Sequence, residues 1–420
     1  MTTQTSKRIE SQCKAAFLAS KQLVSLETKT KNNLISAMAK ALETNCERIL
    51  EANTRDMQLG KEHGLSTALL DRLLLNKERI QSCRDSLEII QQLDDPIGEV
   101  LTSWVRPNGL KISKLRVPLG VIGIIYEARP NVTVDAIGLT LKTGNSVVLR
   151  GSSSAYQTNR EIVSILQSVL SESGLNESCI QLLEDTSREG VKTFVKMKSY
   201  LSLIIPRGGA GLIQSVVKES CVPTIETGVG NCHLYVDQYA DLNKALAIVI
   251  NAKTQRPSVC NACESVLVHR AVSETFLTKL CPALIQLGVE IRGCTTSKSL
   301  YSSIQLASEE DWDTEFLDLI LAIKVVDSID DALDHIDRHG TFHTEGIISE
   351  DNDAITRFSE KVDASAVVIN TSTRFTDGGE FGFGAEIGIS TQKLHARGPM
   401  GLPELTSYKY LIEGSGQIRS

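Results

Sequence analysis

The chain has 420 residues, of which 41% are hydrophobic and 23% charged, a composition typical of a soluble protein with two or three domains. Its net charge of −7, and the lack of any stretch near the ~20 apolar residues of a membrane span, argue against nucleic acids and membranes as partners. The ten cysteines are scattered and the N-terminus lacks an apolar signal core, so we expect a reducing, cytoplasmic location.

The first part of the chain, residues 7–95, is predicted to be helical. Apolar side chains recur there at the spacing of one helix face, as from Leu34 to Leu42. Thr44 and Glu47 match a capping box, in which both side chains bind free amide groups at the start of a helix. We expect this region to be a scaffold, because it carries no pattern typical of chemistry.

A β-hairpin is predicted next. Residues 99–105 and 110–117 alternate around Asn108-Gly109, a pair that suits tight turns. The free edge of a hairpin readily finds a partner, so we expect this one to contact another subunit. The tail from Ser390 also alternates weakly, and we expect it to reach a neighbouring subunit.

Buried parallel strands are predicted from three apolar runs, 117–126, 146–150 and 200–205. Helical segments separate them, the clearest being Arg160 to Leu170. Strands that alternate with helices are typical of a doubly wound α/β domain.

Polar or glycine-rich loops follow these strands, at the edge where open α/β sheets bind ligands. The loops are 127–134, 151–154 and 206–211. A glycine-rich turn that opens a helix lets backbone amides approach a phosphate. None of the three has the spacing Gly-x-Gly-x-x-Gly, so the loops alone indicate no particular cofactor.

A second α/β unit is predicted to begin near Thr227. It follows a loop, 221–231, that carries the lone carboxylate Glu226. Its predicted strands are 233–237, 265–269, 316–326 and 366–370. The stretch 371–388 is too rich in glycine and charge for a core, so we expect it to be a substrate loop.

The strongest candidate for chemistry is the polar loop 251–264, which holds Cys260 between an apolar helix and a buried strand. Thiolate is the reactive form of cysteine, and nearby cations such as Lys253 and Arg256 lower the pKa that controls it. Most free cysteines are small core residues. These residues alone therefore leave both a nucleophile and a structural cysteine possible.

Two further patterns have metal-like or redox-like spacing. Cys260 and Cys263 form a Cys-x-x-Cys pair, but no second pair is placed to complete a zinc site. His335, His339 and His343 would share one helix face, but Gly340 interrupts that helix. We therefore expect no metal.

Four parts of the sequence together resemble the gamma-glutamyl phosphate reductases, a family of the aldehyde dehydrogenase superfamily. They are 125–133, 225–233, 255–262, and 372–377 with 391–400. The resemblance spans nearly the whole chain and implies an aldehyde-dehydrogenase-like fold with two doubly wound α/β domains. The implied parts are an NADPH-binding domain (1–96 and 118–226), a catalytic domain (227–389) and an oligomerisation element (97–117 and 390–420).

The resemblance implies NADPH-dependent reduction of L-glutamate 5-phosphate to L-glutamate 5-semialdehyde, the second step of proline biosynthesis from glutamate. Cys260 falls on the nucleophile that forms a thioester, and Asn131 with the Cys260 backbone N–H on the oxyanion donors. Glu226 matches the water-activating base of aldehyde-oxidising relatives, but a reductase must not hydrolyse its thioester, so a proton-shuttling role is equally open. Glu315 matches the residue that holds the nicotinamide ribose, although its neighbours depart from the family pattern.

The charges of the substrate indicate which residues bind it. Planar guanidinium groups bind carboxylates and phosphates through two parallel hydrogen bonds, so we expect Arg256 and Arg374 to hold these groups. Asp377 suits the α-ammonium group. All three lie in the stretches that carry the resemblance.

The cofactor residues are expected in two loops of the first domain. Arg150, Gly151 and Ser152 follow the second strand, where an NAD-specific site would carry a carboxylate. A cation there suits the 2′-phosphate of NADPH instead. The glycine-rich turn contributes Arg207, Gly208 and Gly209.

Two other functions fit the same residues. A hydrolytic aldehyde dehydrogenase would use Glu226 to activate water and oxidise a semialdehyde. A catalytically silent assembly subunit would keep the fold, but the set of Asn131, Glu226 and Cys260 argues against it. We expect a homo-oligomer, and association with a glutamate 5-kinase is left open.

Overall fold

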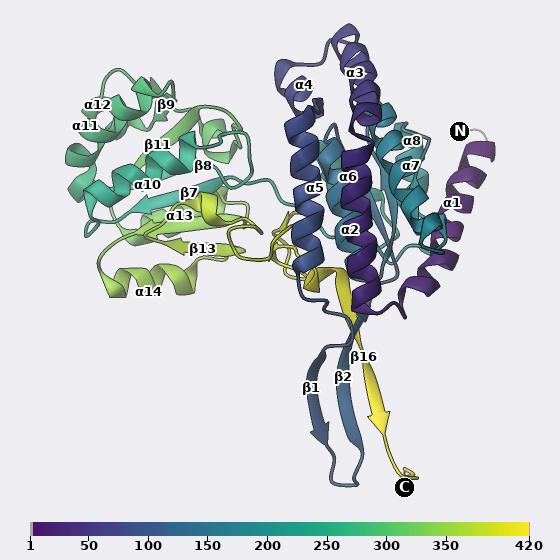
Figure 1. Ribbon diagram of the computed structural model, residues 1–420. Helices are drawn as coiled ribbons and strands as arrows, with labels where there is room; N and C mark the ends of the chain where they lie inside the picture. The colour runs from purple at the N-terminus through teal and green to yellow at the C-terminus, as the bar shows by residue number, and fades with distance from the viewer. Residues whose placement is uncertain (1–2, 420) are drawn as a thin grey trace. The chain divides into compact units, whose positions relative to one another are not determined.

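The computed structural model describes residues 3–419 and divides into two compact units (Figure 1). Unit 1 contains the described residues up to Glu226, together with Gly382–Gly388 and 400–419. Unit 2 contains Thr227–Phe381 and Ile389–Pro399. The end of the expected catalytic domain, 227–389, is divided differently here. Gly382–Gly388 belongs to unit 1, whereas Ile389–Pro399 belongs to unit 2. Among the described residues, no helix has both the length and the apolar character needed to cross a membrane.

Unit 1 is built on a four-stranded parallel sheet with the order β5-β4-β3-β6. The strands are β3 (Val121–Tyr126), β4 (Ser146–Arg150), β5 (Ile180–Leu182) and β6 (Leu203–Arg207). The helices that follow or cover them are α1 (Thr3–Leu23), α6 (Pro130–Lys142), α7 (Tyr156–Glu172), α8 (Arg188–Phe194) and α9 (Ala210–Glu219), with short η1 (Ser153–Ala155) and η2 (Glu177–Cys179). Every residue of β3 and β4 is buried, as expected where helices cover both faces. Helices α1, α8 and α9 share one apolar cluster with this sheet.

The remaining helices of unit 1 form an outer layer against α6 and α7. They are α2 (Thr28–Thr44), α3 (Cys46–Glu62), α4 (Thr67–Leu73) and α5 (Lys77–Gln92). The helical prediction for this region is confirmed, but the predicted capping box is wrong. Thr44 lies inside the last turn of α2, where its hydroxyl donates to the carbonyl of Lys40, four residues back. Asn45 then separates α2 from α3.

A three-stranded antiparallel ribbon projects from unit 1 (Figure 1). It consists of β1 (Val100–Val105), β2 (Lys111–Pro118) and β16 (Thr406–Glu413), and a short η5 (Pro403–Leu405) precedes β16. The predicted hairpin is confirmed by the pairing of β1 with β2 around Gly109, whose φ is 85°. The predicted single strand 117–126 is wrong. Gly120, with a φ of 118°, turns the chain between β2 and β3, so the apolar run belongs to two different sheets.

Unit 2 contains a seven-stranded sheet with the order β10-β9-β11-β8-β7-β12-β13, in which every neighbouring pair is parallel. Its strands are β7 (Cys232–Val236), β8 (Cys263–His269), β9 (Glu290–Gly293), β10 (Gln305–Leu306), β11 (Ile320–Val326), β12 (Thr344–Ile348) and β13 (Ala366–Ile369). Its helices are α10 (Leu242–Thr254), α11 (Arg270–Gln286), α12 (Thr295–Leu300), α13 (Ile329–His339) and α14 (Asn352–Lys361), with short η3 (Glu309–Asp313) and η4 (Thr373–Phe375). A small β14 (Ile389–Ser390) pairs with β15 (Gly398–Pro399).

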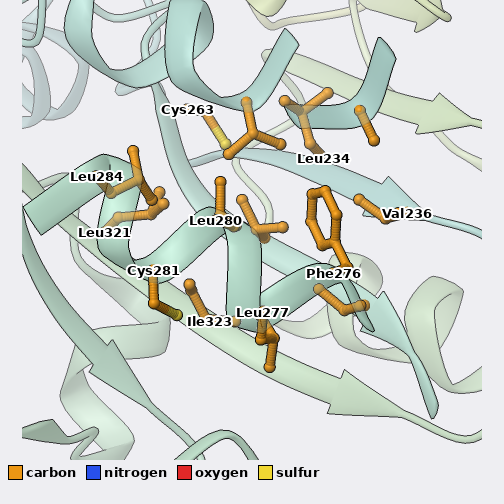
Figure 2. Packing of buried hydrophobic residues seen from close by; sticks show 14 of the residues in the cluster. Leu234, Val236, Cys263, Phe276, Leu277, Leu280, Cys281, Leu284, Leu321 and Ile323 are labelled. Carbon is orange, nitrogen blue, oxygen red and sulfur yellow. The ribbon is translucent and has the colours of Figure 1, made fainter. Parts of the chain in front are cut away.

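The core of unit 2 follows from the alternation of side chains along its strands. Leu234 and Val236 face a cluster to which α10 contributes Val249, and α11 contributes Phe276 and Leu280 (Figure 2). Tyr235, between them, faces the opposite cluster with α13 and α14. The predicted strand 316–326 is too long at its start. β11 begins only at Ile320, after a loop in which Leu317 has a φ of 54°.

Candidate active site

Cys260 lies in a tight turn that joins α10 to β8. The amide of Ala262 donates to the carbonyl of Val259 at 3.0 Å, so Cys260 and Asn261 are the two central residues of a β-turn. Asn261 and Ala262 are buried, whereas Cys260 is only partly buried. The turn thus anchors its buried half in unit 2 and leaves the cysteine partly accessible.

The loop before β7, at Gly230, packs closely against the Cys260 backbone. A Cβ at Gly230 would lie 1.6 Å from the Cys260 carbonyl oxygen, so only glycine permits this approach. The Gly230 amide donates to Glu315 Oε1 at 2.8 Å. Glu315, predicted to bind the cofactor, therefore lies beside the Cys260 turn within unit 2, a position that sequence spacing could not reveal.

The predicted substrate loop lies on the other side of the same turn. The Asn261 side-chain amide donates to the Thr376 carbonyl at 2.8 Å, and the Thr373 hydroxyl donates to the Asn261 carbonyl at 2.6 Å. These bonds hold η4, which carries Arg374, against the turn. The structure therefore brings the predicted residues Cys260 and Arg374 into one region.

Arg374 is part of a charged group around Cys260. Burial lowers the pKa of the Arg374 guanidinium, the Asp377 carboxylate offsets part of that effect, and the charges of Arg256 and Cys260 act on it as well. Its Nε donates to the Gln255 side chain at 2.8 Å. A guanidinium in this environment keeps its charge, so the turn has a cation beside it, together with the carboxylates of Asp377 and Glu380.

The other two predicted substrate residues differ in their surroundings. Arg256 is exposed, as suits a group that meets a charged ligand. Asp377 Oδ1 instead accepts the amide of Gly379 at 2.8 Å and that of Glu380 at 3.4 Å. One oxygen of the predicted ammonium binder is thus used to shape its own loop.

A buried ion pair that sequence reasoning did not find lies directly behind the turn. Lys253 and Glu264 are both fully buried and form a salt bridge. Burial raises the pKa of Glu264 to about 7, although Lys253 acts in the opposite direction. The other carboxylate oxygen accepts the Leu317 amide at 3.3 Å. A carboxylate inside an apolar strand was the available signal, and Lys253, taken from the sequence as a cation near the thiol, is engaged by Glu264.

In unit 1, the predicted oxyanion donor Asn131 is exposed in the first turn of α6. Its side chain hydrogen-bonds to the carboxylate of Asp135, which also accepts the Ser86 hydroxyl at 2.6 Å. Burial raises the pKa of Asp135, and the nearby charge of Arg207 partly offsets this. An amide nitrogen carries two hydrogens, so this contact orients Asn131 and leaves one donor for a ligand. Glu226 lies half-buried at the end of unit 1.

The order of the sheet in unit 1 places its ligand crevice. The chain runs from β3 to β4 and β5 on one side and then returns to β6 on the other, so the direction reverses between β3 and β6. The loops that follow these two strands meet there, because the Gly209 amide donates to Glu127 Oε2 at 3.2 Å. A Cβ on Gly209 would have no neighbour within 4 Å, so the start of α9 is open.

The loop after β4 holds Arg150 more tightly than expected. Only 8% of this residue is exposed, and its Nη2 donates to the carbonyls of Thr186 and Ser187. Its Nε is buried with no hydrogen-bond partner among the described residues, which leaves a donor for a ligand. Burial lowers the pKa of this guanidinium. Gly151 is packed against the Asn159 side chain, and Ser152 hydrogen-bonds to Ser154.

The expected interruption of the histidine-bearing helix at Gly340 is confirmed. His335 and His339 lie on α13 with ring centroids 4.4 Å apart, whereas His343 lies beyond Gly340 and outside the helix. Burial and neighbouring positive groups lower the pKa of His335 to about 2. No cluster of three or more His, Cys, Asp or Glu side chains suited to a metal occurs in the described part of the chain.

Comparison with known proteins gives a consistent result. The model of the "Aldehyde dehydrogenase family" matches residues 1–298. The chain is 58% identical to a gamma-glutamyl phosphate reductase from Moorella thermoacetica over 96% of both chains, and 57% identical to one from Heliobacterium modesticaldum over 97% of both. It is also similar to the crystal structure of a gamma-glutamyl phosphate reductase from Thermotoga maritima, with a TM-score of 0.96, 47% identity, and coverage of 98% of this chain and 100% of the other.

Proposed function

Because the chain belongs to the gamma-glutamyl phosphate reductases of the aldehyde dehydrogenase family, we propose that it reduces L-glutamate 5-phosphate through a thioester on Cys260. The products are L-glutamate 5-semialdehyde and phosphate, and the reaction is the second step of proline biosynthesis from glutamate. The observation that carries the proposal is the turn at Cys260, fixed by two loops and flanked by the charge of Arg374.

The chain's own residues account for the first step. The Cys260 thiolate attacks the acyl carbon, the bond from that carbon to the phosphate oxygen breaks, and phosphate leaves with the electron pair. Phosphate is a good leaving group, so no strong general acid is needed. Asn131, oriented by Asp135, and the Cys260 amide are the donors that stabilise the oxyanion. Glu226 then has no water to activate and serves instead as a local proton carrier.

Members of the family use a nicotinamide cofactor, which supplies the hydride when bound, and we propose NADPH for this chain. The residues fit such a group, because Arg150 Nε is a buried donor with no partner among the described residues and the start of α9 is open at Gly209. Arg150, with Gly151 and Ser152, would hold the 2′-phosphate end. Arg207, Gly208 and Gly209 would hold the diphosphate, for which the Glu127 carboxylate must give up the Gly209 amide. Glu315 would hold the nicotinamide ribose.

Three residues of unit 2 are proposed to hold the substrate. Arg374 and Arg256 bind its carboxylate and phosphate, since their charges act on each other and Arg374 interacts with Cys260. Asp377 binds the α-ammonium group through the carboxylate oxygen that its loop does not use. This arrangement leaves the acyl carbon of the substrate accessible to the Cys260 thiol.

We further propose a cytoplasmic homo-oligomer that assembles through the ribbon of β1, β2 and β16. All residues of β1 are exposed, including Trp104 and Val105, and β16 exposes Tyr410 and Ile412. An exposed apolar sheet edge of this kind favours a partner strand. The ten cysteines are all free, as a reducing compartment requires. A transient association with a glutamate 5-kinase would shorten the exposure of the labile acyl phosphate to water.

The test runs the reaction backwards with glutamate semialdehyde, phosphate and NADP⁺, and follows the absorbance of the reduced cofactor. We expect phosphate-dependent turnover that Cys260→Ser abolishes and Cys263→Ala largely retains. Phosphate-independent acid formation would instead identify a hydrolytic aldehyde dehydrogenase. No turnover by the wild-type protein would identify a silent subunit.

A further inference from the structure

Cys232, the first residue of β7, contacts the backbone of the nucleophile. Its thiol donates to the carbonyl of Cys260 at 3.2 Å, and its sulfur is 3.6 Å from His343 Nδ1. Cys232 is fully buried. Neither the reaction above nor the other contacts of the loop require a thiol at this position.

The carbonyl that accepts this bond is the one whose direction distinguishes the two common forms of the turn. In a β-turn closed from Val259 to Ala262, the carbonyl of Cys260 belongs to the central peptide. That peptide has two orientations, found in type I and type II turns, which differ by about 150° in ψ of the second residue. Rotation of the central peptide changes ψ of Cys260 and φ of Asn261. It would move the Cys260 carbonyl and the Asn261 amide, the two polar backbone groups that follow the Cys260 thiol in the chain.

The second orientation is within reach of this sequence. A type II turn requires a positive φ at its third residue, and asparagine adopts positive φ several times more readily than most residues. The third residue here is Asn261, and its φ is not positive in this structure. A contact that holds the Cys260 carbonyl on its present side therefore selects between two accessible states.

Burial and its neighbours keep Cys232 suited to this role. Desolvation raises the pKa of its thiol well above the usual range, and the Glu345 carboxylate acts in the same direction. The thiol therefore keeps its proton at neutral pH and stays a donor. Gly230 also packs against this carbonyl, because a Cβ there would overlap the Cys260 carbonyl oxygen.

We propose that Cys232 is a positioning residue for the nucleophile, whose thiol holds the central peptide of the catalytic turn, and so the polar backbone groups next to the Cys260 thiol, in the orientation that the reaction uses. The inference rests on the proposed function of Cys260. It assigns to Cys232 no contact with substrate or cofactor.

The matched control is Cys263, which pairs with Cys232 across β7 and β8, is equally buried, and donates instead to the carbonyl of Ser265 at 3.3 Å. Cys232→Ala removes the donor to the turn, Cys232→Ser replaces it with a hydroxyl donor, and Cys263→Ala removes a thiol of the same kind elsewhere. Melting temperatures of all three variants show whether each is folded.

Two readouts are measured on the full chain. The first is kcat and KM in the reverse direction. The second is the rate of alkylation of Cys260 by iodoacetamide. It is followed by peptide mass spectrometry, because Cys221 is exposed and two other cysteines, Cys46 and Cys294, are partly buried as Cys260 is. A misplaced reacting group costs up to about 100-fold in rate. We expect Cys232→Ala to lower kcat and the alkylation rate at least about tenfold with KM within about twofold, Cys232→Ser to recover most of the loss, and Cys263→Ala to match the wild type.

Three results would overturn the proposal. One is a Cys232→Ala variant that behaves like Cys263→Ala. Another is a serine variant as impaired as the alanine variant, which would show that volume rather than a donor matters. The third is a loss confined to KM. Retained turnover in Cys260→Ser would refute the proposed nucleophile instead, while the alkylation rates would still decide the role of Cys232.

Discussion

Substitution of Gly230 by alanine tests how closely the two loops around the nucleophile must approach. The new Cβ would lie 1.6 Å from the Cys260 carbonyl oxygen, 2.4 Å from its carbonyl carbon and 2.8 Å from its Cα. All three are backbone atoms, which no rotation of a side chain can move aside. Either the loop before β7 or the Cys260 turn must therefore shift as a whole.

The size of the shift sets the expected effect. Real Cβ atoms essentially never lie under 3.0 Å from a neighbour, so the two segments must separate by about 1.4 Å. A misplacement of about 1 Å at a reacting group costs on the order of 100-fold in rate. That corresponds to about 3 kcal/mol of activation free energy. Overpacking of this kind also destabilises a fold by about 1–3 kcal/mol.

The assay is the phosphate-dependent reverse reaction, with kcat and KM determined separately. Gly401→Ala is the control, because its Cβ would meet its nearest neighbour at an ordinary 3.4 Å. We expect Gly230→Ala to lose about 100-fold in kcat and stay folded, while Gly401→Ala keeps wild-type rates. A Gly230→Ala enzyme within about threefold of the wild type would refute the link between this contact and the geometry of the nucleophile.

Three further substitutions have defined outcomes. Arg374→Ala should raise the substrate KM about 10- to 100-fold, the equivalent of one charge-assisted hydrogen bond, and an unchanged KM would remove Arg374 from the site. Arg150→Ala should erode the preference for NADPH over NADH, and wild-type protein that uses both equally would contradict the placement of that loop. Lys253→Met should destabilise the fold by about 3–5 kcal/mol, because it leaves Glu264 buried without its cation. Since the folded pKa of Glu264 lies above its usual 4.5, at about 7, stability from this group is lost as pH rises through that window. Urea denaturation should therefore show a larger penalty at pH 8 than at pH 5.5, and equal penalties would argue against a charged Glu264.

The sequence predicts regular elements well where a local pattern decides them. The strand Ser146–Arg150 and the hairpin of β1 and β2 follow from apolar runs and from Asn108-Gly109. The run from Val117 misleads because apolar periodicity does not show where a chain changes sheets, and only Gly120 marks the turn. The cap at Thr44 fails because the same hydroxyl also bonds within a helix.

The candidate site is predictable to a different degree. Motifs of the family place Cys260, Arg374 and Glu315 on the sequence, but they do not indicate which of these residues touch. The amide of Gly230 on Glu315 and the thiol of Cys232 on the Cys260 carbonyl join segments far apart in the chain. Such contacts depend on the packing of whole loops, which no local propensity encodes.

The ribbon has a consequence for how the chain folds as it is made. β16 pairs with β2 from Thr406↔Pro118 to Glu413↔Lys111, so the segment that separates the partners includes the whole of unit 2. Synthesis proceeds from the N-terminus, so one edge of β2 stays unpaired until β16 has been made. Unit 2 lies entirely within that interval. A nascent chain thus carries an unpaired strand edge until β16 is made, and a chain truncated before Thr406 keeps that edge permanently, exposed to pairing with other unfinished chains.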